Sequence, residues 1–263
     1  MAQSPLIDAA VKAGAKPVEQ AIIPANETRA LTVEEEMRAL IAQAEREDGD
    51  AAYQVRPPRW KLVAAAQSFQ QNLTEEIVPK INAVIIASRI TRTLWSGEEG
   101  ETRAPICTSK DGREGVVQDH DAFVNMIPEG VDMNIFDPIP CHRCPFNQWG
   151  SGKAGRGKLC KETRNLLLMP EGAGMPALLS VPPSSVVNFD NYATGMKSKG
   201  LSYAAVVTTV SATKAKNPDG QDFSKVLFAP GRTLNVDELR IALGLRKQWE
   251  AFVAEVSDEE FGE

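Results

Sequence analysis

The sequence has few of the residues that acid–base or metal-activated catalysis requires. Among 263 residues there are only two histidines, His120 and His142, and we find no carboxylate cluster and no Ser/His arrangement. Asp119, His120 and Asp121 are adjacent, but adjacent loop side chains point in different directions. No run of 18 apolar residues occurs and the first residues lack an apolar signal core, so we expect neither a membrane span nor secretion. These absences favour a non-enzymatic cytoplasmic protein.

The net charge at first also argues against a nucleic-acid partner. There are 35 acidic and 29 basic side chains, a formal net charge of -6. Their distribution changes that conclusion: residues 1–50 hold five bases and ten acids, and residues 255–263 hold five acids and no base. The remaining residues, 51–254, hold 24 bases and 20 acids. We therefore expect a basic body between two acidic ends, which permits an anionic partner.

The first region, residues 1–52, reads as an N-terminal arm with one amphipathic helix. Residues 1–30 have no stable hydrophobic period, which indicates an arm that is largely disordered. Thr32 and Glu35 form a capping-box pattern ahead of a helix that extends to about Glu47. Its apolar stripe is too narrow for a core element, and we place the main boundary near residue 52.

The body alternates between strand and helix patterns. Strands are predicted at 81–95, 165–169, 177–181, 203–210 and 223–228, with a helix from Ser184 to Gly200 between the third and fourth. Asn235 and Glu238 open a last helix. This order is that of the OB-fold, a small barrel that binds oligonucleotides. We predict an α+β, mainly β protein: a five-stranded OB-like barrel over residues 53–232, a Cys-rich insertion at about 97–164, a C-terminal helix at 233–254 and flexible acidic ends.

The four cysteines have the spacing of a metal site. Cys141 and Cys144 form a C-x2-C pair in a polar loop, and Cys107 and Cys160 bracket it. Four thiolates satisfy tetrahedral zinc and leave no open position for water, so we predict a structural Zn²⁺ site. His120 is an alternative fourth ligand if Cys107 is not one. A redox pair would need a βαβ context, and disulfides are improbable without secretion, so unligated thiols are the main alternative.

Basic and aromatic residues alternate in the body, as single-strand binding requires. Cations follow the phosphates while flat rings stack on bases. Core packing is the alternative use of each ring, and a solvated surface that of each charge cluster. The predicted phosphate contacts are Arg56, Arg59, Lys61, Arg89, Arg92, Lys153, Arg156, Lys158 and Lys161, and the predicted stacking residues are Trp60, Trp95, Phe146, Trp149 and Tyr203.

Four segments resemble single-stranded DNA-binding proteins of bacteriophages and prophages. They are residues 105–112, 141–151, 157–161 and 182–192, of which the spaced cysteines and the Gly157-Lys158-Leu159-Cys160 run are the most specific. The resemblance covers about residues 80–230 and leaves the N-terminal arm unmatched. It implies an OB-like barrel with a zinc-binding insertion, an acidic tail, and a role in DNA replication or recombination in the cytoplasm of a bacterial host.

We therefore predict a binder of single-stranded DNA with little sequence preference. The acidic tail would recruit replication or recombination proteins through Asp258, Glu259, Glu260 and Phe261, and would compete with DNA for the basic groove. No membrane partner is expected, and the sequence leaves room for a homo-oligomer. The alternative function is a zinc-ribbon module that regulates a polymerase or nuclease through protein contacts without touching nucleic acid. The alternative for the tail is a solvated end without a partner.

Overall fold

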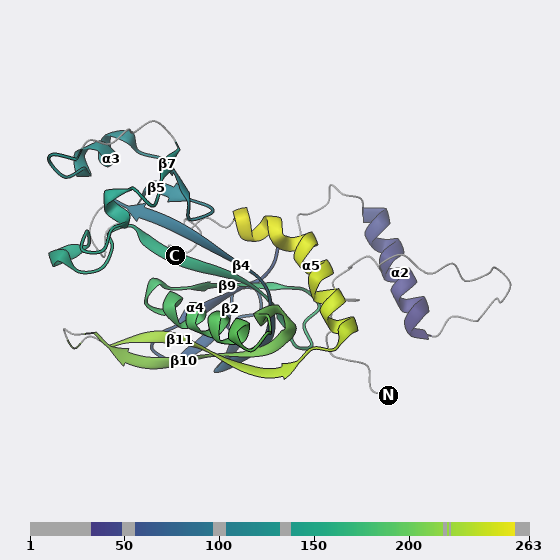
Figure 1. Cartoon of the computed structure of the whole chain (residues 1–263). Helices are drawn as coiled ribbons and strands as arrows, with labels where there is room; N and C mark the ends of the chain where they lie inside the picture. The colour runs from purple at the N-terminus through teal and green to yellow at the C-terminus, as the bar shows by residue number, and fades with distance from the viewer. Residues whose placement is uncertain are drawn as a thin grey trace. The chain divides into compact units, whose positions relative to one another are not determined.

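The computed structural model describes residues 33–48, 56–96, 104–131, 138–217, 220 and 222–255 (Figure 1). Contacts divide the chain into two units, one of which spans Lys16–Arg56. This unit contains the predicted helix, α2 (Val33–Asp48), whose apolar side chains Met37, Leu40 and Ile41 are all more than half exposed. All the strands belong to the other unit from Pro57 onward. The predicted arm before residue 33 and the tail residues Asp258, Glu259, Glu260 and Phe261 lie outside the described residues.

The main unit is mixed α+β and mainly β, as the sequence predicts. One path through the sheet follows the order β3-β2-β1-β9-β8-β4-β5-β6-β7, and β10 joins β4 and β11 beside it. The strands are β1 (Arg59–Val63), β2 (Ser68–Gln71), β3 (Ile77–Val78), β4 (Lys80–Trp95), β5 (Pro105–Ser109), β6 (Glu114–Val117), β7 (Ile139–Pro140), β8 (Lys161–Pro170), β9 (Ala177–Val181), β10 (Val206–Lys216) and β11 (Asp222–Thr233).

The helices of this unit are short except for two. The long ones, α4 and α5, correspond to the two helices predicted in the body. The full set is α3 (His120–Met126), the 3₁₀ turns η1 (Pro145–Asn147) and η2 (Lys153–Gly155), α4 (Pro183–Ser198), the 3₁₀ turn η3 (Tyr203–Ala205) and α5 (Val236–Glu255). None of the helices in the described ranges is long and apolar enough to cross a membrane.

Strand β4 connects the central core to the cysteine-rich insertion. It is 16 residues long, and its β-branched composition suits a strand that is buried on both faces over much of its length. Its first half pairs with β10, its last residues pair with β5, and β8 runs antiparallel along its other edge. The register shifts between Ile85 and Ala87. One continuous strand thus fixes the insertion relative to the body.

The sheet is open, and the described strands do not show the five-stranded OB-like barrel that the sequence predicts. The second edge of β9 pairs in parallel with β1, and no pairing among the described residues joins β11 to that edge. Strands β1 to β3 were not predicted, and they occupy the place where a fifth strand would close the barrel. Helix α4 instead supplies hydrogen-bond partners to the backbone of β11. Asn188 Nδ2 donates to the Val226 carbonyl and Val226 N–H donates to Ser185 Oγ, both at 2.9 Å.

Three apolar clusters stabilise the main unit. The central one lies between the sheet and α4, and includes Phe69, Ile85, Leu168 and Phe189. A second lies between the sheet and α5, which runs along β4 toward the arrowhead end of that strand (Figure 1). The third belongs to the insertion and combines Phe123 and Phe146 with the cysteines. The insertion therefore has a small core of its own.

Helix α5 begins at a capping box that also closes an ion-pair network. Asn235 Oδ1 accepts the Glu238 N–H and Glu238 Oε2 accepts the Asn235 N–H, both at 2.9 Å, as the sequence predicts for this pair. Glu238 is 2% exposed and accepts two hydrogen bonds from Arg232, which also contacts Glu171. The hydrogen bond from Arg232 to Glu238 is the main reason that the pKa of Arg232 is raised.

We expect Glu238→Ala to lower the free energy of unfolding by about 1–3 kcal/mol. The change removes a helix cap and the charged acceptor of Arg232, although Arg232 keeps partial access to water. Denaturant unfolding followed by circular dichroism measures the effect. The matched control is Asp237→Ala, which removes an exposed Arg240 pair on the same turn and should cost less than about 0.5 kcal/mol. Equal losses in the two variants would contradict a special role for Glu238.

Candidate metal and nucleic-acid site

The four cysteines converge on one small cavity in the insertion. Cys107 lies in β5, Cys141 follows β7, Cys144 precedes η1 and Cys160 precedes β8. All four line a space of about 10 Å³, roughly that of one water-sized sphere. None of them forms a disulfide. The strands therefore bring together side chains that are 53 positions apart in the sequence, from Cys107 to Cys160.

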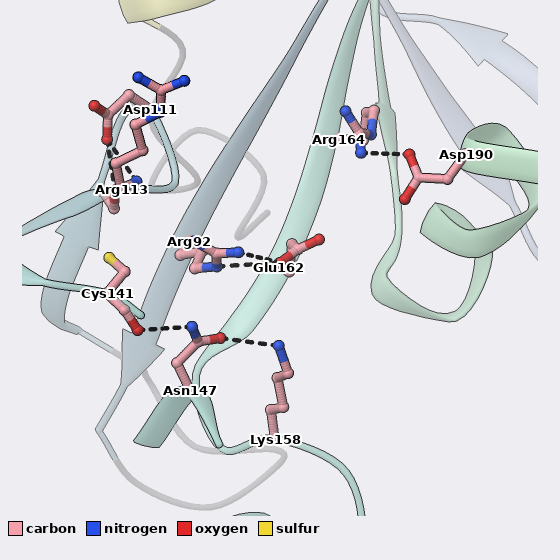
Figure 2. A network of polar contacts seen from close by, with 10 residues as sticks. Arg92, Asp111, Arg113, Cys141, Asn147, Lys158, Glu162, Arg164 and Asp190 are labelled. Atoms are coloured by element: carbon pink, nitrogen blue, oxygen red, sulfur yellow. Dashed lines mark hydrogen bonds and ion pairs between the residues drawn. The ribbon is translucent and has the colours of Figure 1, made fainter. Parts of the chain in front are cut away.

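The C-x2-C turn is held by a chain of hydrogen bonds. The Cys141 N–H donates to the Arg113 carbonyl at 2.7 Å, which ties the turn to the start of β6. Asn147 is buried, and its Nδ2 donates to the Cys141 carbonyl at 2.7 Å. Lys158 Nζ donates to Asn147 Oδ1 at 3.1 Å, and Figure 2 shows this chain from Lys158 to Cys141. The two ends of the loop are thus locked together by the protein itself.

Gly115 leaves the space that the thiols occupy. A Cβ atom at this position of β6 would lie 2.8 Å from the sulfur of Cys107 and 3.7 Å from the sulfur of Cys141. Any side chain would therefore displace Cys107 from the cavity. The sequence gives no sign of this role, because Gly115 is 26 residues from the C-x2-C pair.

Burial favours the neutral form of two of the thiols in this cavity, Cys144 and Cys160. Burial raises the pKa of Cys144, and the backbone N–H groups of Phe146 and Asn147 act in the opposite direction. Burial also raises the pKa of Cys160, and the neighbouring Cys144, Cys107 and Cys141 raise it further. Several thiolates could share this space only with a cation among them. Two N–H donors already directed at Cys144 fit a metal-bound thiolate.

The four thiols line one cavity but are not identified as a set of metal ligands. Among the described residues, no group of three or more Cys, His, Asp or Glu side chains has an arrangement that could hold a metal. Cysteine side chains can change rotamer without a movement of the backbone, so a shared cavity does not require a ligand set to be formed already. His142 is exposed and His120 begins α3, and neither lines the cavity. His120 therefore does not replace Cys107 in this structure.

The loop between Cys144 and Cys160 presents cations and one tryptophan to solvent. Trp149 is 82% exposed, and Lys153, Arg156 and Lys161 are also exposed. The loop folds back on itself because Gly150 N–H donates to the Gly157 carbonyl at 2.7 Å. A Cβ on Gly152 would approach the Arg156 carbonyl oxygen to 2.1 Å, so only glycine fits this crossing.

Two of the predicted phosphate contacts have structural roles instead. Arg92 donates from Nε and Nη2 to Glu162 Oε2, at 3.1 and 2.6 Å (Figure 2). It also lines the cysteine cavity. Lys158 is half-buried and holds Asn147. Local spacing cannot reveal these partners, because Glu162 lies 70 residues from Arg92 and meets it only through the β4–β8 register.

Three of the predicted stacking residues belong to the interior. Trp60 is 6% and Phe146 3% exposed, and the Phe146 ring meets Phe123 edge-on at a centroid distance of 5.2 Å. Tyr203 is half-buried and packs on Phe189 at 5.6 Å. Core packing, the alternative use of each ring, is what the structure shows for these three. Trp95 is half-buried at the end of β4.

The alternation of β4 and β8 creates a row of polar side chains on one face of the sheet. The register pairs Arg89 with Asn165, Thr91 with Thr163 and Thr93 with Lys161. Asn165 Nδ2 donates to Thr91 Oγ1 at 3.3 Å, and Ser180 Oγ on β9 donates to Asn165 Oδ1 at 2.6 Å. We call this row of side chains the polar face, and it consists of Arg89, Thr91, Thr93, Trp95, Lys161, Thr163, Asn165 and Ser180.

The polar face joins several predicted binding residues and excludes others. Arg89, Trp95 and Lys161 border it, while Thr91, Thr93 and Asn165 in its centre are at most 3% exposed. Arg92 points to the opposite face. Further along the same face, Ala87 and Leu167 pack in the apolar cluster beneath α5. Its threonines were not recognised from the sequence, although Arg89, Thr91, Thr93 and Trp95 occupy every second position there.

Three other predicted phosphate contacts belong to other elements of the chain. Arg59 and Lys61 flank Trp60 on β1, where Arg59 is half-buried and Lys61 exposed. Arg56 is exposed and belongs to the other unit.

Comparison of the chain with protein-family models, with curated proteins and with solved structures found no match. The function of the chain is therefore inferred from the geometry of the site.

Proposed function

We propose that the protein binds single-stranded DNA through the loop between Cys144 and Cys160 and the border of the polar face. The observation that carries this proposal is Trp149, 82% exposed on a loop that also presents Lys153 and Arg156. A tryptophan this exposed contributes nothing to the core, while stacking on a base contributes about 1–3 kcal/mol. Stacking on a ring and pairing of a cation with a phosphate do not distinguish one base from another, so little base preference is expected. Replication and recombination are the processes that expose such strands.

We also propose that Cys107, Cys141, Cys144 and Cys160 hold a structural Zn²⁺. A tetrahedral thiolate site has no open position, so zinc would stabilise the fold without a catalytic role. When bound, the metal would supply the cross-links that fix the loop between Cys144 and Cys160. A stable loop is needed because Trp149 can stack only at a defined position.

The acidic C-terminal tail has the charge to compete with DNA for this surface. Helix α5 runs along β4 toward the end of the strand that carries Trp95 (Figure 1). Residues 256–263 follow this helix in the sequence. They hold four acids and no base. We infer that the tail competes with DNA for the border of the polar face and binds partner proteins when DNA displaces it.

Deletion of residues 256–263 should tighten binding to a short oligothymidylate at low salt. The gain should shrink as salt rises, because screening weakens the competition between tail and phosphates. Fluorescence anisotropy over a salt series measures both trends. A variant with the four tail acids changed to their amides separates charge from length, and it should reproduce the deletion. Unchanged affinity in both variants would contradict the competition.

A protein-interaction module remains the alternative function, and exposed apolar residues of the insertion favour it. Val116 is 49%, Val124 38% and Val131 40% exposed, close in sequence to the cysteines. A gel-shift series with single-stranded DNA, RNA and duplex competitors discriminates between the two functions. Retardation of single-stranded DNA supports the proposed function, and no retardation by the metal-loaded protein favours the module.

A further inference from the structure

A groove at one end of the sheet is not used by the site described above. It has a volume of about 630 Å³, within the range of ligand sites in proteins. Trp60, Ile81 and Ala177 of the central core line it. The β2–β3 turn and the β8–β9 turn supply most of the other lining residues: Gln71, Leu73, Thr74, Glu76, Pro170, Glu171, Gly172, Ala173, Gly174 and Met175.

The groove is lined by side chains with hydrogen-bond donors, one of which has no acceptor among the described residues. The indole N–H of Trp60 is buried, and no described residue accepts a hydrogen bond from it. Gln71 Oε1 accepts from Thr74, and Asn82 Oδ1 accepts from Thr209, so both amide oxygens are used within the protein. Neither side chain is buried, so both amide nitrogens can donate to a molecule bound in the groove. Such a lining suits a ligand with several acceptors.

The charges of the groove balance. Glu76 and Lys80 carry opposite charges, and Glu171 is paired with Arg232 at 3.2 Å. A phosphate would gain little electrostatic attraction from such a lining, and an uncharged planar group does not need any to bind. Leu73, Pro170 and Met175 add apolar surface for the faces of a ring. Nucleobases are planar, neutral and rich in acceptors, and the pyrimidine thymine has two carbonyl acceptors.

We propose that this groove binds one unstacked pyrimidine base of the single-stranded DNA. The inference depends on the proposed function and adds a second contact to it, distant in sequence from Trp149. It also gives Trp60 a role in binding. Trp60 is too buried to stack on a base, but the N–H at the edge of its ring would donate a hydrogen bond to one. Lys80 is exposed at the same groove and would meet the adjoining phosphate.

Nuclear magnetic resonance of the full-length chain tests the proposal directly. The four tryptophans give four indole N–H signals, and Trp60→Phe and Trp149→Phe assign two of them. On titration of the wild-type protein with a short oligothymidylate, both assigned signals should shift, that of Trp60 downfield as its N–H gains an acceptor. A shift of Trp149 with Trp60 unchanged would overturn the groove and leave the proposed function intact. If neither signal shifts and no binding is detected, the proposed function itself fails.

A pair of alanine variants provides the second measurement. Ala173→Leu adds bulk inside the groove, and the matched Ala65→Leu adds it at an exposed turn between β1 and β2. We expect Ala173→Leu to weaken oligothymidylate binding about fivefold or more, the lower end of the effect of removing one stacked base. Ala65→Leu should change affinity less than about twofold. Equal affinities for the two variants, with both folded by circular dichroism, would overturn the proposal.

Discussion

Cys144→Ser should abolish stoichiometric zinc binding and disorder the insertion while the rest of the sheet stays folded. Serine has nearly the shape of cysteine but does not supply a thiolate, and three ligands cannot close the site. Cys144 is also the residue toward which the N–H groups of Phe146 and Asn147 are directed, so its loss removes the best prepared ligand. The zinc affinity should fall by about two orders of magnitude or more.

Metal content and local stability together test this expectation. Wild-type protein should carry one zinc per chain by elemental analysis, and chelation should expose the segment between Cys107 and Cys160 to proteolysis. The control variant is His142→Ala, which changes an exposed neighbour inside the same C-x2-C turn and should retain zinc. Wild-type protein without zinc, even after reconstitution under reducing conditions, would contradict the metal site and favour four unligated buried thiols.

The elements with a clear hydrophobic period were predictable, and the pairings between them were not. Strand β9 coincides with the predicted 177–181, and the Asn235–Glu238 cap forms as expected, because both depend on neighbours in sequence. Strand β1 was missed because Arg59 and Lys61 beside Trp60 suggest a surface cluster rather than a strand. Its parallel pairing with β9 depends on residues more than a hundred positions away, and that pairing keeps the sheet open.

The candidate site shows the same division between local and distant information. The convergence of the four cysteines follows from chain order once β4, β5 and β8 are neighbours, and the sequence indicated the set that lines the cavity. The roles of Arg92 and Lys158 could not be predicted in this way. A cation in a basic run looks available for phosphate until a register places Glu162 opposite Arg92, or a loop folds Lys158 onto Asn147.

The role of Lys158 also decides how the DNA-binding loop should be tested. Lys158→Ala would release Asn147 from one of its partners and disturb the cysteine turn, so weaker binding would have two explanations. Lys153 and Arg156 are exposed on the same loop and lie outside the cysteine cavity. They are therefore the cations to change, alone and together with Trp149.

We expect Trp149→Ala to weaken binding to a short oligothymidylate by about 1–3 kcal/mol, roughly 5- to 150-fold, at every salt concentration. Stacking releases no counterions, so the salt slope should not move. Lys153→Ala with Arg156→Ala should instead lower that slope by about 1.4, or about 0.7 for each phosphate of a single strand that is no longer neutralised. Fluorescence anisotropy over a salt series separates the two effects.

The matched control for the charge change is Lys197→Ala with Lys199→Ala, two exposed lysines at the end of α4. It removes the same charge from a different surface, so the general attraction of the protein for DNA falls equally in the two double variants. A salt slope that decreases equally in both would mean that net charge, not this loop, attracts the strand. A slope that decreases only with Lys153 and Arg156, combined with a salt-independent loss for Trp149→Ala, assigns phosphates and bases to the same loop. That combination requires the strand to lie across the loop that joins Cys144 to Cys160.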